Sequence, residues 1–260
     1  MKNNNSIQVR ILGCSGGIGG NLRTTSILVD DDILIDAGTG VADLSIEAMM
    51  AIDHIFVTHS HLDHIACIPL LVDTVIGMRE KHITVHATCE TWKILKDHIF
   101  NWKIWPDFSV IPDEVDPFLR HQEIRLGETI DLNGCKITPV PANHTVPAVG
   151  FQLDSGRASL VFTGDTTSCD PLWEALNRIG NLKYLIIETA FGNGEAALAQ
   201  LSHHLYPSLL FEELKKLESS PEIFVTHLKP GEESEIMRQV SNGAMGINLQ
   251  PLMPQQTFIL

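Results

Sequence analysis

One short stretch of the sequence, THSHLDH at residues 58–64, carries four potential metal ligands directly after the apolar run IFV. Burying so many of them in a protein core would cost free energy, because each buried imidazole or carboxylate needs a partner. Neutral imidazole and carboxylate groups bind Zn²⁺, Mn²⁺ and Fe²⁺. The stretch therefore predicts a metal centre, and its candidate ligands are His59, His61, Asp63 and His64.

The spacing of these ligands favours two metal ions rather than one. His59 and His61 stand two positions apart, so on an extended segment their side chains point the same way. Asp63 and His64 follow where a helix is expected to begin. Four protein groups are too many for a single catalytic ion that must keep an open position, whereas two ions about 3.5–4 Å apart would use all of them.

Further ligands are expected at the ends of three later strands. His144 follows the run ITPVPA, Asp165 ends the run LVFTGD, and His227 ends the run EIFVTH. Open sheets place their sites at the carboxyl ends of strands, and an aspartate in such a position can bridge two cations. Together with the ligands upstream, these residues predict a dinuclear centre.

Hydrophobic periodicity predicts the elements that position these groups. Strands are expected at residues 7–12, on both sides of a turn at 30–32, at 54–59, 82–87, 184–190, 223–228 and 256–260, with a mainly β texture from 123 to 165. Helices are expected at 41–52, 64–78, from 90, from 171, near 195, at 207–217 and before the last strand. This interspersed order predicts an α/β protein with two stacked sheets and helices outside them.

Composition limits the classes of protein that fit. The 260 residues, 44% hydrophobic and 19% charged, indicate a folded globular chain rather than a disordered one. No linker rich in Pro, Gly or Ser divides the chain, so one domain is expected over residues 1–260, with an aromatic helix–loop element near 90–121. The net charge of −14, without a Lys/Arg run, argues against a nucleic-acid partner.

Cysteine content and the N-terminal sequence indicate the compartment. The five cysteines are scattered without a CxxC pair, which excludes a full disulfide framework and favours a reducing compartment. The first residues, MKNNNSIQVRILG, lack the apolar region of a signal peptide, and no apolar stretch reaches about 18 residues. A soluble cytoplasmic protein without a membrane partner is expected.

A glycine-rich segment, GCSGGIGG at residues 13–20, follows the first predicted strand. Such a loop suggests a phosphate cradle, but this one lacks the Lys-Ser/Thr of a P-loop and is followed by strands rather than by a clear helix. A turn at the rim of a sheet is the favoured interpretation.

The order of the motifs resembles the metallo-β-lactamase superfamily of hydrolases over nearly the whole chain. The shared pattern is HxHxDH, a later histidine, an aspartate in TGD and a final histidine in THL. The resemblance implies a four-layer αββα sandwich in which Asp36, in the segment LVDDDILIDAGTG, steadies the histidine loop. It also implies how the ligands divide: His59, His61 and His144 hold one metal, Asp63, His64 and His227 hold the other, and Asp165 bridges them.

Finer features resemble the class II 3′,5′-cyclic-nucleotide phosphodiesterases. The similar blocks are HSHLDHIACIPLLVDT, HIFNWKIWPDF, NHTVPAVGFQL and LSHHLYP. Two residues depart from the pattern: Cys67 stands where glycine or serine is usual, and His203 turns the commoner SGH into SHH. Aligned on the following LYP, His204 takes the functional place, and His203 is the alternative.

This resemblance implies hydrolysis of cyclic AMP or cyclic GMP to the 5′-monophosphate with two divalent ions, most readily Zn²⁺, with Mn²⁺ or Fe²⁺ also possible. Two such ions offset the charge of a cyclic phosphodiester and lower the pKa of a bridging water, whose hydroxide attacks phosphorus. His204 is the candidate general acid for the leaving oxygen. Asp63 is the second catalytic candidate.

Contacts to the rest of a small-molecule substrate are expected from the aromatic stretch and from one threonine. Trp105, Phe100 and Trp102 offer stacking surfaces, and Asn101 can hydrogen-bond a base or a phosphate. Thr166 is a further substrate-binding candidate. For any single aromatic residue, packing in a lid or in a homodimer contact is the favoured interpretation.

Several further activities share these ligands and stay open. A ribonuclease Z-like RNA-processing phosphodiesterase requires a basic docking arm, which a net charge of −14 without a basic run does not supply. A lactonase or thioesterase of the same fold also fits this ligand set. An iron oxidoreductase is disfavoured, because such proteins usually alter the HxHxDH ligands or append a flavin-binding domain, for which 260 residues leave no room. The complete ligand set makes a metal-bound protein without turnover the least favoured alternative. The preference between cyclic AMP and cyclic GMP, the native metal and the oligomeric state are open as well. The remaining histidines are expected to be structural: His54, His82, His86, His98, His121 and His203.

Overall fold

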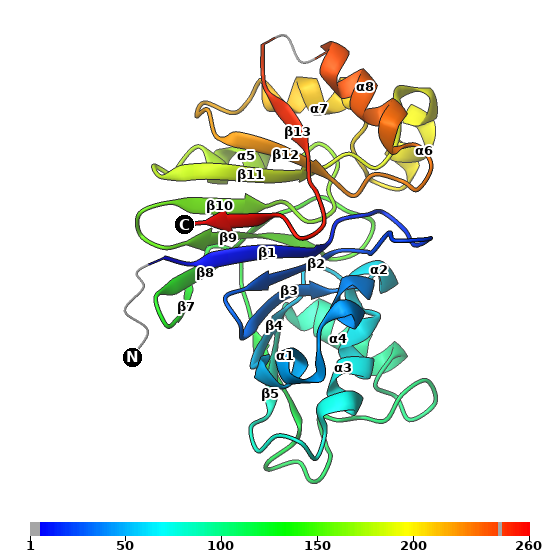
Figure 1. The fold of residues 1–260 in the computed structure, drawn as a ribbon, viewed down its shortest axis with the longest axis vertical. Coiled ribbons are helices and arrows are strands. Elements are labelled where there is room, and N and C mark those ends of the chain that lie inside the picture. Colours follow the sequence, from blue (N-terminus) through cyan, green and yellow to red (C-terminus); the bar gives the residue numbers. More distant parts are fainter. Residues whose placement is uncertain (1–5, 244–245) are drawn as a thin grey trace.

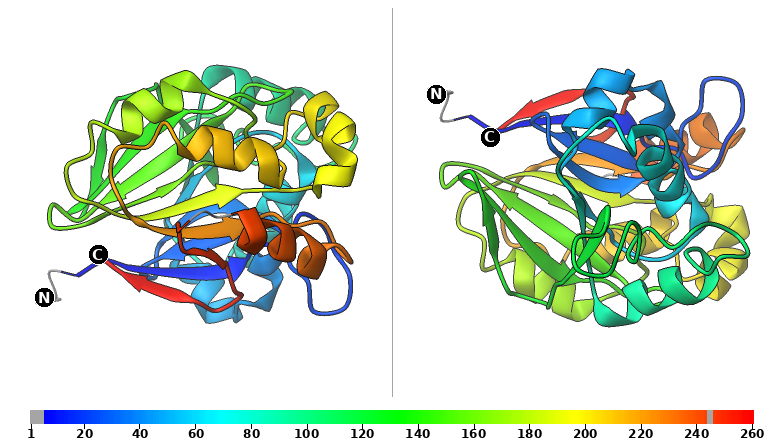
Figure 2. Two further views of the ribbon diagram at one scale, coloured as in Figure 1. Left: turned by 90° about the horizontal axis from the view of Figure 1, so that it is seen from above. Right: turned by 90° about the horizontal axis from the view of Figure 1, so that it is seen from below.

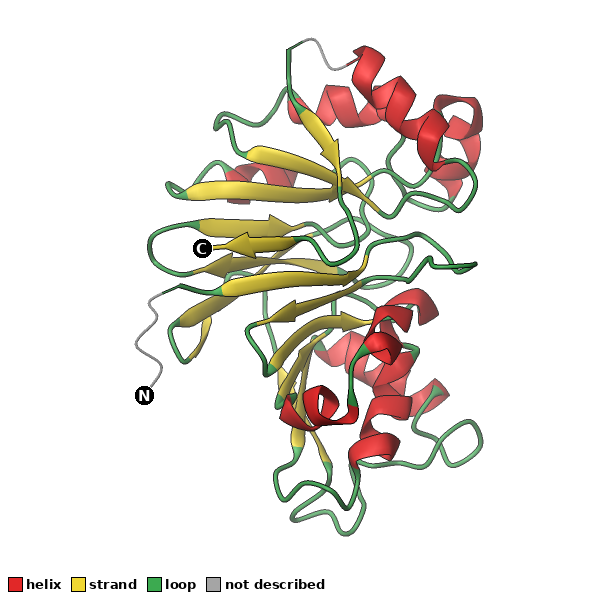
Figure 3. Cartoon of the chain, viewed as in Figure 1, coloured by secondary structure: helices red, strands yellow, loops and turns green. Residues whose placement is uncertain are grey.

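The computed structural model describes residues 6–243 and 246–260. Two seven-stranded sheets pack against each other, and helices cover the outer face of each (Figure 1). Figure 3 shows the strands gathered in the middle of the molecule, with helices above and below them. The predicted four-layer αββα sandwich is confirmed.

The first sheet contains the N-terminal half of the chain and the C-terminal strand, in the order β14-β1-β2-β3-β4-β5-β6. Its strands are β1 (Gln8–Gly13), β2 (Ser26–Val29), β3 (Ile33–Ala37), β4 (His54–Phe56), β5 (Ile83–Ala87), β6 (Leu119–Glu123) and β14 (Thr257–Ile259). Side chains from its helices pack on its outer face. These helices are η1 (Thr39–Asp43), α1 (Ile46–Ala51), α2 (Leu62–Ile65), α3 (Cys67–Val75) and α4 (Cys89–His98).

The second sheet has the order β13-β12-β11-β10-β9-β8-β7. Its strands are β7 (Ile130–Leu132), β8 (Cys135–Pro141), β9 (Val149–Asp154), β10 (Ser159–Phe162), β11 (Leu182–Glu188), β12 (Glu222–Thr226) and β13 (Leu249–Pro251). On its outer face pack α5 (Asp170–Leu176), α7 (Pro207–Leu214) and α8 (Glu233–Gly243). The short helices η2 (Asn193–Glu195) and α6 (Ala196–Leu201) follow β11.

Among the described residues, three large hydrophobic clusters hold these layers together, and a small fourth cluster contains Ala190, Phe191 and Ala199. Between the sheets, Phe56 and Phe151 meet edge to face with ring centroids 5.5 Å apart, inside a cluster to which both sheets contribute. Each sheet forms a second cluster with its own helices. Strands covered on both faces must be apolar at nearly every position, and β3 is buried along its whole length.

Parallel strands bring the predicted site residues to one edge of the sandwich. In the first sheet β3 and β4 are parallel neighbours, and in the second sheet β10, β11 and β12 are parallel. The carboxyl ends of parallel strands lie on the same side of a sheet, which is where open sheets place their sites. Figure 1 shows β10 and β11 pointing toward the side on which α2 and α6 lie.

Two predicted helices are each divided in the structure. The segment 41–52 forms η1 and α1, because the side chain of Ser45 accepts the N–H of Ala48 (3.2 Å) and caps a new helix. The segment 64–78 forms α2 and α3, and α2 begins at Leu62, earlier than predicted.

The state of the cysteines and the character of the helices are the structural features that relate to the expected compartment. All five cysteines are free, and burial raises the pKa of the Cys14 and Cys135 thiols to about 12. In the part of the chain that the structure describes, no helix has both the length and the apolar character needed to cross a membrane.

One of the remaining histidines, His86 on β5, is a fully buried core residue. Its ring stacks on Phe56 with centroids 4.1 Å apart, and its Nε2 lies 3.0 Å from Nδ1 of His54. Burial, aided by His54, lowers the pKa of His86 to about 3. An imidazole that stays neutral in the folded chain but titrates near pH 6.5 in the unfolded chain weakens folding as the pH falls through that window.

We therefore expect the free energy of unfolding to fall between pH 7.5 and pH 5 by about 2 kcal/mol more in the wild type than in His86→Gln, which cannot be protonated. Above pH 6.5 this contribution of His86 is fully present. Urea unfolding of both proteins with metal removed by a chelator measures the difference. Equal pH slopes in the two proteins would contradict a depressed pKa at His86.

Candidate metal centre

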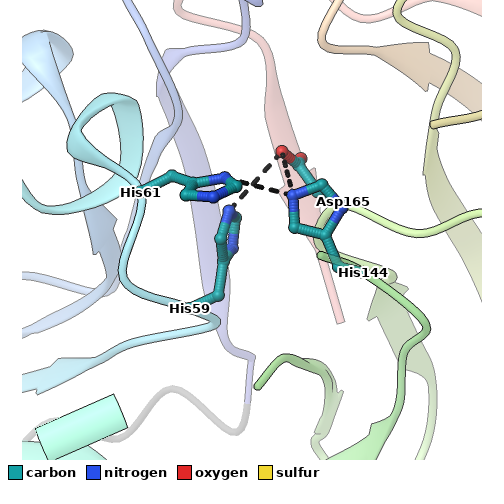
Figure 4. Close-up of side chains that lie close together, drawn as sticks. All are labelled: His59, His61, His144 and Asp165. Carbon is teal, nitrogen blue, oxygen red and sulfur yellow. Dashed lines mark hydrogen bonds and ion pairs between the residues drawn. The ribbon is translucent and has the colours of Figure 1, made fainter. Parts of the chain in front are cut away.

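The predicted ligands converge at the edge of the sandwich, where the strands of both sheets end. They form two overlapping groups, and within each group the ligand atoms all lie within 4.8 Å of one another. The groups are His59, His61, His144 and Asp165, and Asp63, His64, Asp165 and His227. Figure 4 shows the first group, in which the imidazoles of the histidine loop face His144 and Asp165. This division is the one that the family resemblance implies.

Three buried imidazole nitrogens in this cluster have no hydrogen-bond partner among the described residues. They are Nε2 of His59, Nε2 of His64 and Nδ1 of His227. Two of them lie 3.3–3.4 Å from the carboxylate of Asp165, His64 from Oδ2 and His227 from Oδ1. Buried polar atoms without a partner are rare and cost free energy. Their orientation toward a shared carboxylate fits a pair of divalent cations with N/O ligands.

When no cation is bound, protons on the histidines can balance the negative charge of the carboxylates in the cluster. Burial alone would raise the pKa of Asp165, but the charges of His227 and His64 outweigh burial and hold the pKa well below its ordinary value. Burial likewise opposes a charge on His64, but Asp165 and Asp36 outweigh it and raise the pKa of His64 well above its ordinary value. Because metal ligands must lose their protons, cation binding at this cluster releases protons.

A buried carboxylate, Asp36, holds the histidine loop in place. It follows Ile35 at the end of β3, is fully buried and has a positive φ of 57°. Its Oδ1 accepts the N–H of Thr58 (2.8 Å), and its Oδ2 accepts the Thr58 hydroxyl (2.7 Å) and lies 2.6 Å from Nδ1 of His64. The Nδ1–H of His64 is therefore directed at Asp36, which leaves Nε2 to face Asp165. The resemblance implies that Asp36 steadies the histidine loop, and these contacts are consistent with that role.

The loop that carries His144 is tied to the loop that carries Asp165. The N–H of Asn143 donates to the Thr166 hydroxyl (2.9 Å), and the Asn143 side-chain amide donates to the Ser168 carbonyl (2.8 Å). The Thr166 hydroxyl in turn donates to the Thr167 carbonyl (3.0 Å) and is buried. Thr166, predicted to bind substrate, thus has its hydroxyl engaged within the protein and acts on the position of His144.

Sequence reasoning missed Glu188, a fully buried carboxylate at the end of β11. It accepts the N–H groups of Thr166 (3.0 Å), Ala190 (3.1 Å) and Leu205 (3.2 Å), and it lies 2.8 Å from Nδ1 of His204. The signal was present, because the run LIIE ends on an acidic residue just as the run LVFTGD does. Since the oxygens of Glu188 are already used by hydrogen bonds, we interpret Glu188 and His204 as a hydrogen-bonded pair beside Asp165 rather than as part of a third metal site.

His204 lies beside the ligand cluster and is held by Glu188. Its ring stacks on His227 (centroids 5.3 Å apart) and meets His144 edge to face (5.0 Å). Burial opposes its charged form, but Glu188 and then Asp165 outweigh burial and raise the pKa of His204. Its neighbour His203 contributes its backbone carbonyl, which lies 3.1 Å from Nδ1 of His144. Both histidines of SHH therefore bear on the site, one through its ring and the other through its main chain.

The aromatic residues after α4 mostly pack against the outer core of the first sheet. Phe100 is 1% exposed in the outer core of the first sheet, so no ligand can reach its ring and the alternative of a stacking role is excluded. Packing is the interpretation favoured from the sequence, but Phe100 packs in the core rather than in a lid or a homodimer contact. Trp105 packs against the same core, whereas Trp102 is 65% exposed. The side chain of Asn101 donates to the Asp97 carbonyl and accepts two N–H groups of its own loop. The structure does not bring Asn101 or Trp105 into the ligand cluster.

A pocket of about 630 Å³ adjoins the loop that carries His144. It is lined by residues 88–90, 123–126 and 142–149. His144 is the only candidate ligand among the lining residues, and its side chain is fully buried. Of the predicted substrate contacts, neither Asn101, Trp105 nor Thr166 lines it.

Comparison with known proteins agrees with this geometry. Residues 31–241 match the family described as "Beta-lactamase superfamily domain". The chain belongs to this superfamily of metallo-hydrolases. The resemblance expected from the histidine motif is therefore confirmed at the level of the family and of the fold.

The relatives of this chain within the superfamily carry the names of different activities. A "Probable 3′,5′-cyclic-nucleotide phosphodiesterase" of Yersinia pestis is 26% identical over 277 residues, which cover 86% of this chain and 79% of that protein. Ribonuclease Z of Haloarcula marismortui is 32% identical over 157 residues, which cover 57% of this chain and 48% of that protein. The structure of unliganded yeast PDE1 has a TM-score of 0.82 at 18% identity, covering 98% and 99% of the two chains, and shows the shared fold.

We expect Asp36→Asn to lower metal affinity about 10- to 100-fold, the usual effect of removing an outer partner of a ligand. Asparagine tolerates the positive φ, but its amide places a donor against Nδ1–H of His64, which misdirects that ring. Elemental analysis after dialysis against graded chelator measures the affinity. Asp73→Asn, the same change on an exposed position of α3, is the control and should bind metal as the wild type does. Equal metal retention in both variants would contradict this role for Asp36.

Proposed function

We propose that this protein is a dinuclear metal-dependent phosphodiesterase that hydrolyses cyclic AMP, cyclic GMP or both to 5′-monophosphates. The observation that carries the proposal is the Glu188–His204 pair beside the ligand cluster, with Nδ1 of His204 2.8 Å from Oε1 of Glu188. A phosphodiester needs a proton for its leaving oxygen in addition to metal ions. The match to 79% of the Yersinia pestis phosphodiesterase supports the choice of substrate class.

In this proposal the cluster holds two divalent ions, with Zn²⁺ preferred and Mn²⁺ or Fe²⁺ as alternatives. The residues that would hold them are His59, His61 and His144 for one ion, Asp63, His64 and His227 for the other, and Asp165 for both. When bound, the ions would offset the charge of the phosphodiester and lower the pKa of a water molecule.

Two side chains of the protein then carry out the proton transfers, His204 as the donor and Asp63 as the acceptor. Glu188 holds Nδ1 of His204 and favours the protonated ring, so Nε2 is free to donate a proton to the leaving 3′ oxygen. Asp63 is the second catalytic residue, because its side chain is 29% exposed whereas that of Asp165 is 3% exposed. A carboxylate on the solvent side is placed to accept a proton from an entering water molecule.

The rest of the nucleotide is assigned to the pocket beside the His144 loop, not to Asn101 or Trp105. The volume of that pocket, about 630 Å³, falls in the range of small-molecule sites. The side-chain amide of Asn101 is hydrogen-bonded to the Asp97 carbonyl and to the N–H of Ile104. Trp105 packs against the outer core of the first sheet. Thr166 contributes by fixing Asn143, and thereby His144.

A ribonuclease Z-like activity is the second candidate, because the archaeal ribonuclease Z shares 32% identity over 157 residues. The net charge of −14 disfavours it, since a polyanionic RNA needs a basic surface. A lactonase or thioesterase is compatible with the same ligand set. We also propose that the chain forms a single domain, that it assembles as a homodimer and that it is cytoplasmic.

A substrate panel on metal-loaded protein tests the proposed function. The panel contains cyclic AMP, cyclic GMP, bis-p-nitrophenyl phosphate, a lactone, a thioester and a precursor tRNA, with products identified by chromatography. We expect a 5′-monophosphate from at least one cyclic nucleotide and little turnover of the carbon esters. Cleavage of the tRNA alone would establish the second candidate instead, and hydrolysis of the lactone or thioester alone would refute both.

The adjacent histidines offer a matched pair of variants. We expect His204→Asn to lower kcat on cyclic nucleotide about 10²- to 10⁴-fold, the range for loss of a general acid. His203→Asn should change kcat little, because His203 acts through its carbonyl and asparagine tolerates its positive φ of 55°. Initial rates at matched metal content measure both. Similar losses in the two variants would show that His204 is not the proton donor.

A further inference from the structure

Lys229 is a half-buried cation beside the candidate metal centre that has no carboxylate partner among the described residues. It stands two positions after His227. Its Nζ donates to the Gly16 carbonyl (2.9 Å) and lies over the ring of Phe191, 5.5 Å from the centroid. A charge taken partly out of water is costly unless another charge or polar group compensates it. A chain with 32 acidic and 18 basic residues could readily have supplied an acidic partner here.

The surroundings of Lys229 connect it to the proposed proton donor. Its backbone N–H donates to the Ala190 carbonyl (3.1 Å), two residues after Glu188. The Phe191 ring that its ammonium covers meets His204 edge to face, with centroids 5.7 Å apart.

The glycine-rich loop at residues 13–20 packs against the segment that carries His227 and Lys229. A Cβ on Gly16 would lie 2.4 Å from the His227 carbonyl and 3.1 Å from its ring Cδ2, and one on Gly17 would lie 2.8 Å from Pro230. The N–H of Gly16 donates to the Leu228 carbonyl (3.0 Å). Figures 1 and 2 show this loop, in blue, beside the orange segment that follows β12. These glycines permit a close approach that fixes the Gly16 carbonyl and, through it, the ammonium.

We propose that Lys229, held by the Gly16 carbonyl, binds a phosphoryl oxygen of the substrate and of the product. The ammonium has three donors, and the Gly16 carbonyl uses one of them. A phosphodiester and a phosphate monoester are anions, whereas lactones and thioesters are neutral. A fixed cation at the edge of the metal centre therefore favours phosphoryl substrates within a fold that serves several ester classes. This inference rests on the proposed phosphodiesterase function.

Binding of inorganic phosphate to the metal-loaded protein tests the inference without any substrate. We expect Lys229→Met to weaken phosphate binding, measured by calorimetry, roughly 10- to 100-fold, the loss of one charge-assisted hydrogen bond. Lys229→Gln keeps a donor for the Gly16 carbonyl but removes the charge, and should weaken binding as Lys229→Met does. Lys229→Arg should restore most of the affinity, because a cation is retained.

Lys183→Met is the matched control. Lys183 also donates to a main-chain carbonyl, that of Ile259, and lies over an aromatic ring, that of Tyr184, but it stands near the opposite end of β11 from Glu188. Its removal should leave phosphate affinity unchanged. Wild-type affinity in both Lys229→Met and Lys229→Gln, at two metal ions per chain by elemental analysis, would overturn the inference.

A second measurement uses the wild-type protein in case the neutral variants fail to load metal. Acylation of lysines by a reactive ester, followed by peptide mass spectrometry, should slow at Lys229 and not at Lys183 when phosphate is added. Equal rates at Lys229 with and without saturating phosphate would refute the inference. If Lys229 governs phosphate binding but no cyclic nucleotide is cleaved, the proposed substrate fails while the anion contact stands.

Discussion

The buried ring nitrogens that converge on the carboxylate of Asp165 are the constraint on which the rest of the site depends. The imidazoles of His59, His64 and His227 each leave one ring nitrogen without a hydrogen-bond partner in the described chain, and all three face Asp165. Such an arrangement is unfavourable for a neutral protein interior. It becomes favourable when protons or divalent cations occupy the centre, so folding and cation binding are coupled at this site.

Two further buried carboxylates keep the arrangement from relaxing. Asp36 fixes the loop of the first sheet through Thr58 and His64, and Glu188 fixes the loops of the second sheet through Thr166 and His204. Each accepts several N–H or O–H groups, which compensates its burial. The outer carboxylates thus set the ring orientations on which both metal binding and proton transfer depend.

The sandwich itself is the second requirement, because the two sheets supply different ligands. The histidine loop follows β4 of the first sheet, whereas His144, Asp165 and His227 follow strands of the second. The cluster therefore exists only when the inter-sheet core around Phe56 and Phe151 has formed. Cations that bind across this boundary should stabilise the folded protein by mass action.

The sequence by itself determined the parts of the site and fold that depend on local order. The HxHxDH loop and the residues at strand ends could be recognised, because fully buried strands are apolar runs and their polar successors stand out. The layered fold followed from the order of strands and helices. Helix boundaries were less accurate, because a cap such as Ser45 divides an apolar pattern that looks continuous.

Only the tertiary structure decided which side chains meet across the chain. Glu188 was not recognised as a partner of His204, nor the His203 carbonyl as a partner of His144, because these contacts join residues that are 16 and 59 positions apart and whose distance in space depends on the packing of the elements between them. Phe100 looked available for stacking and is buried. The pairing of Lys229 with Gly16, 213 residues apart, likewise required the packed sheets, since through-space distance is not encoded in local spacing.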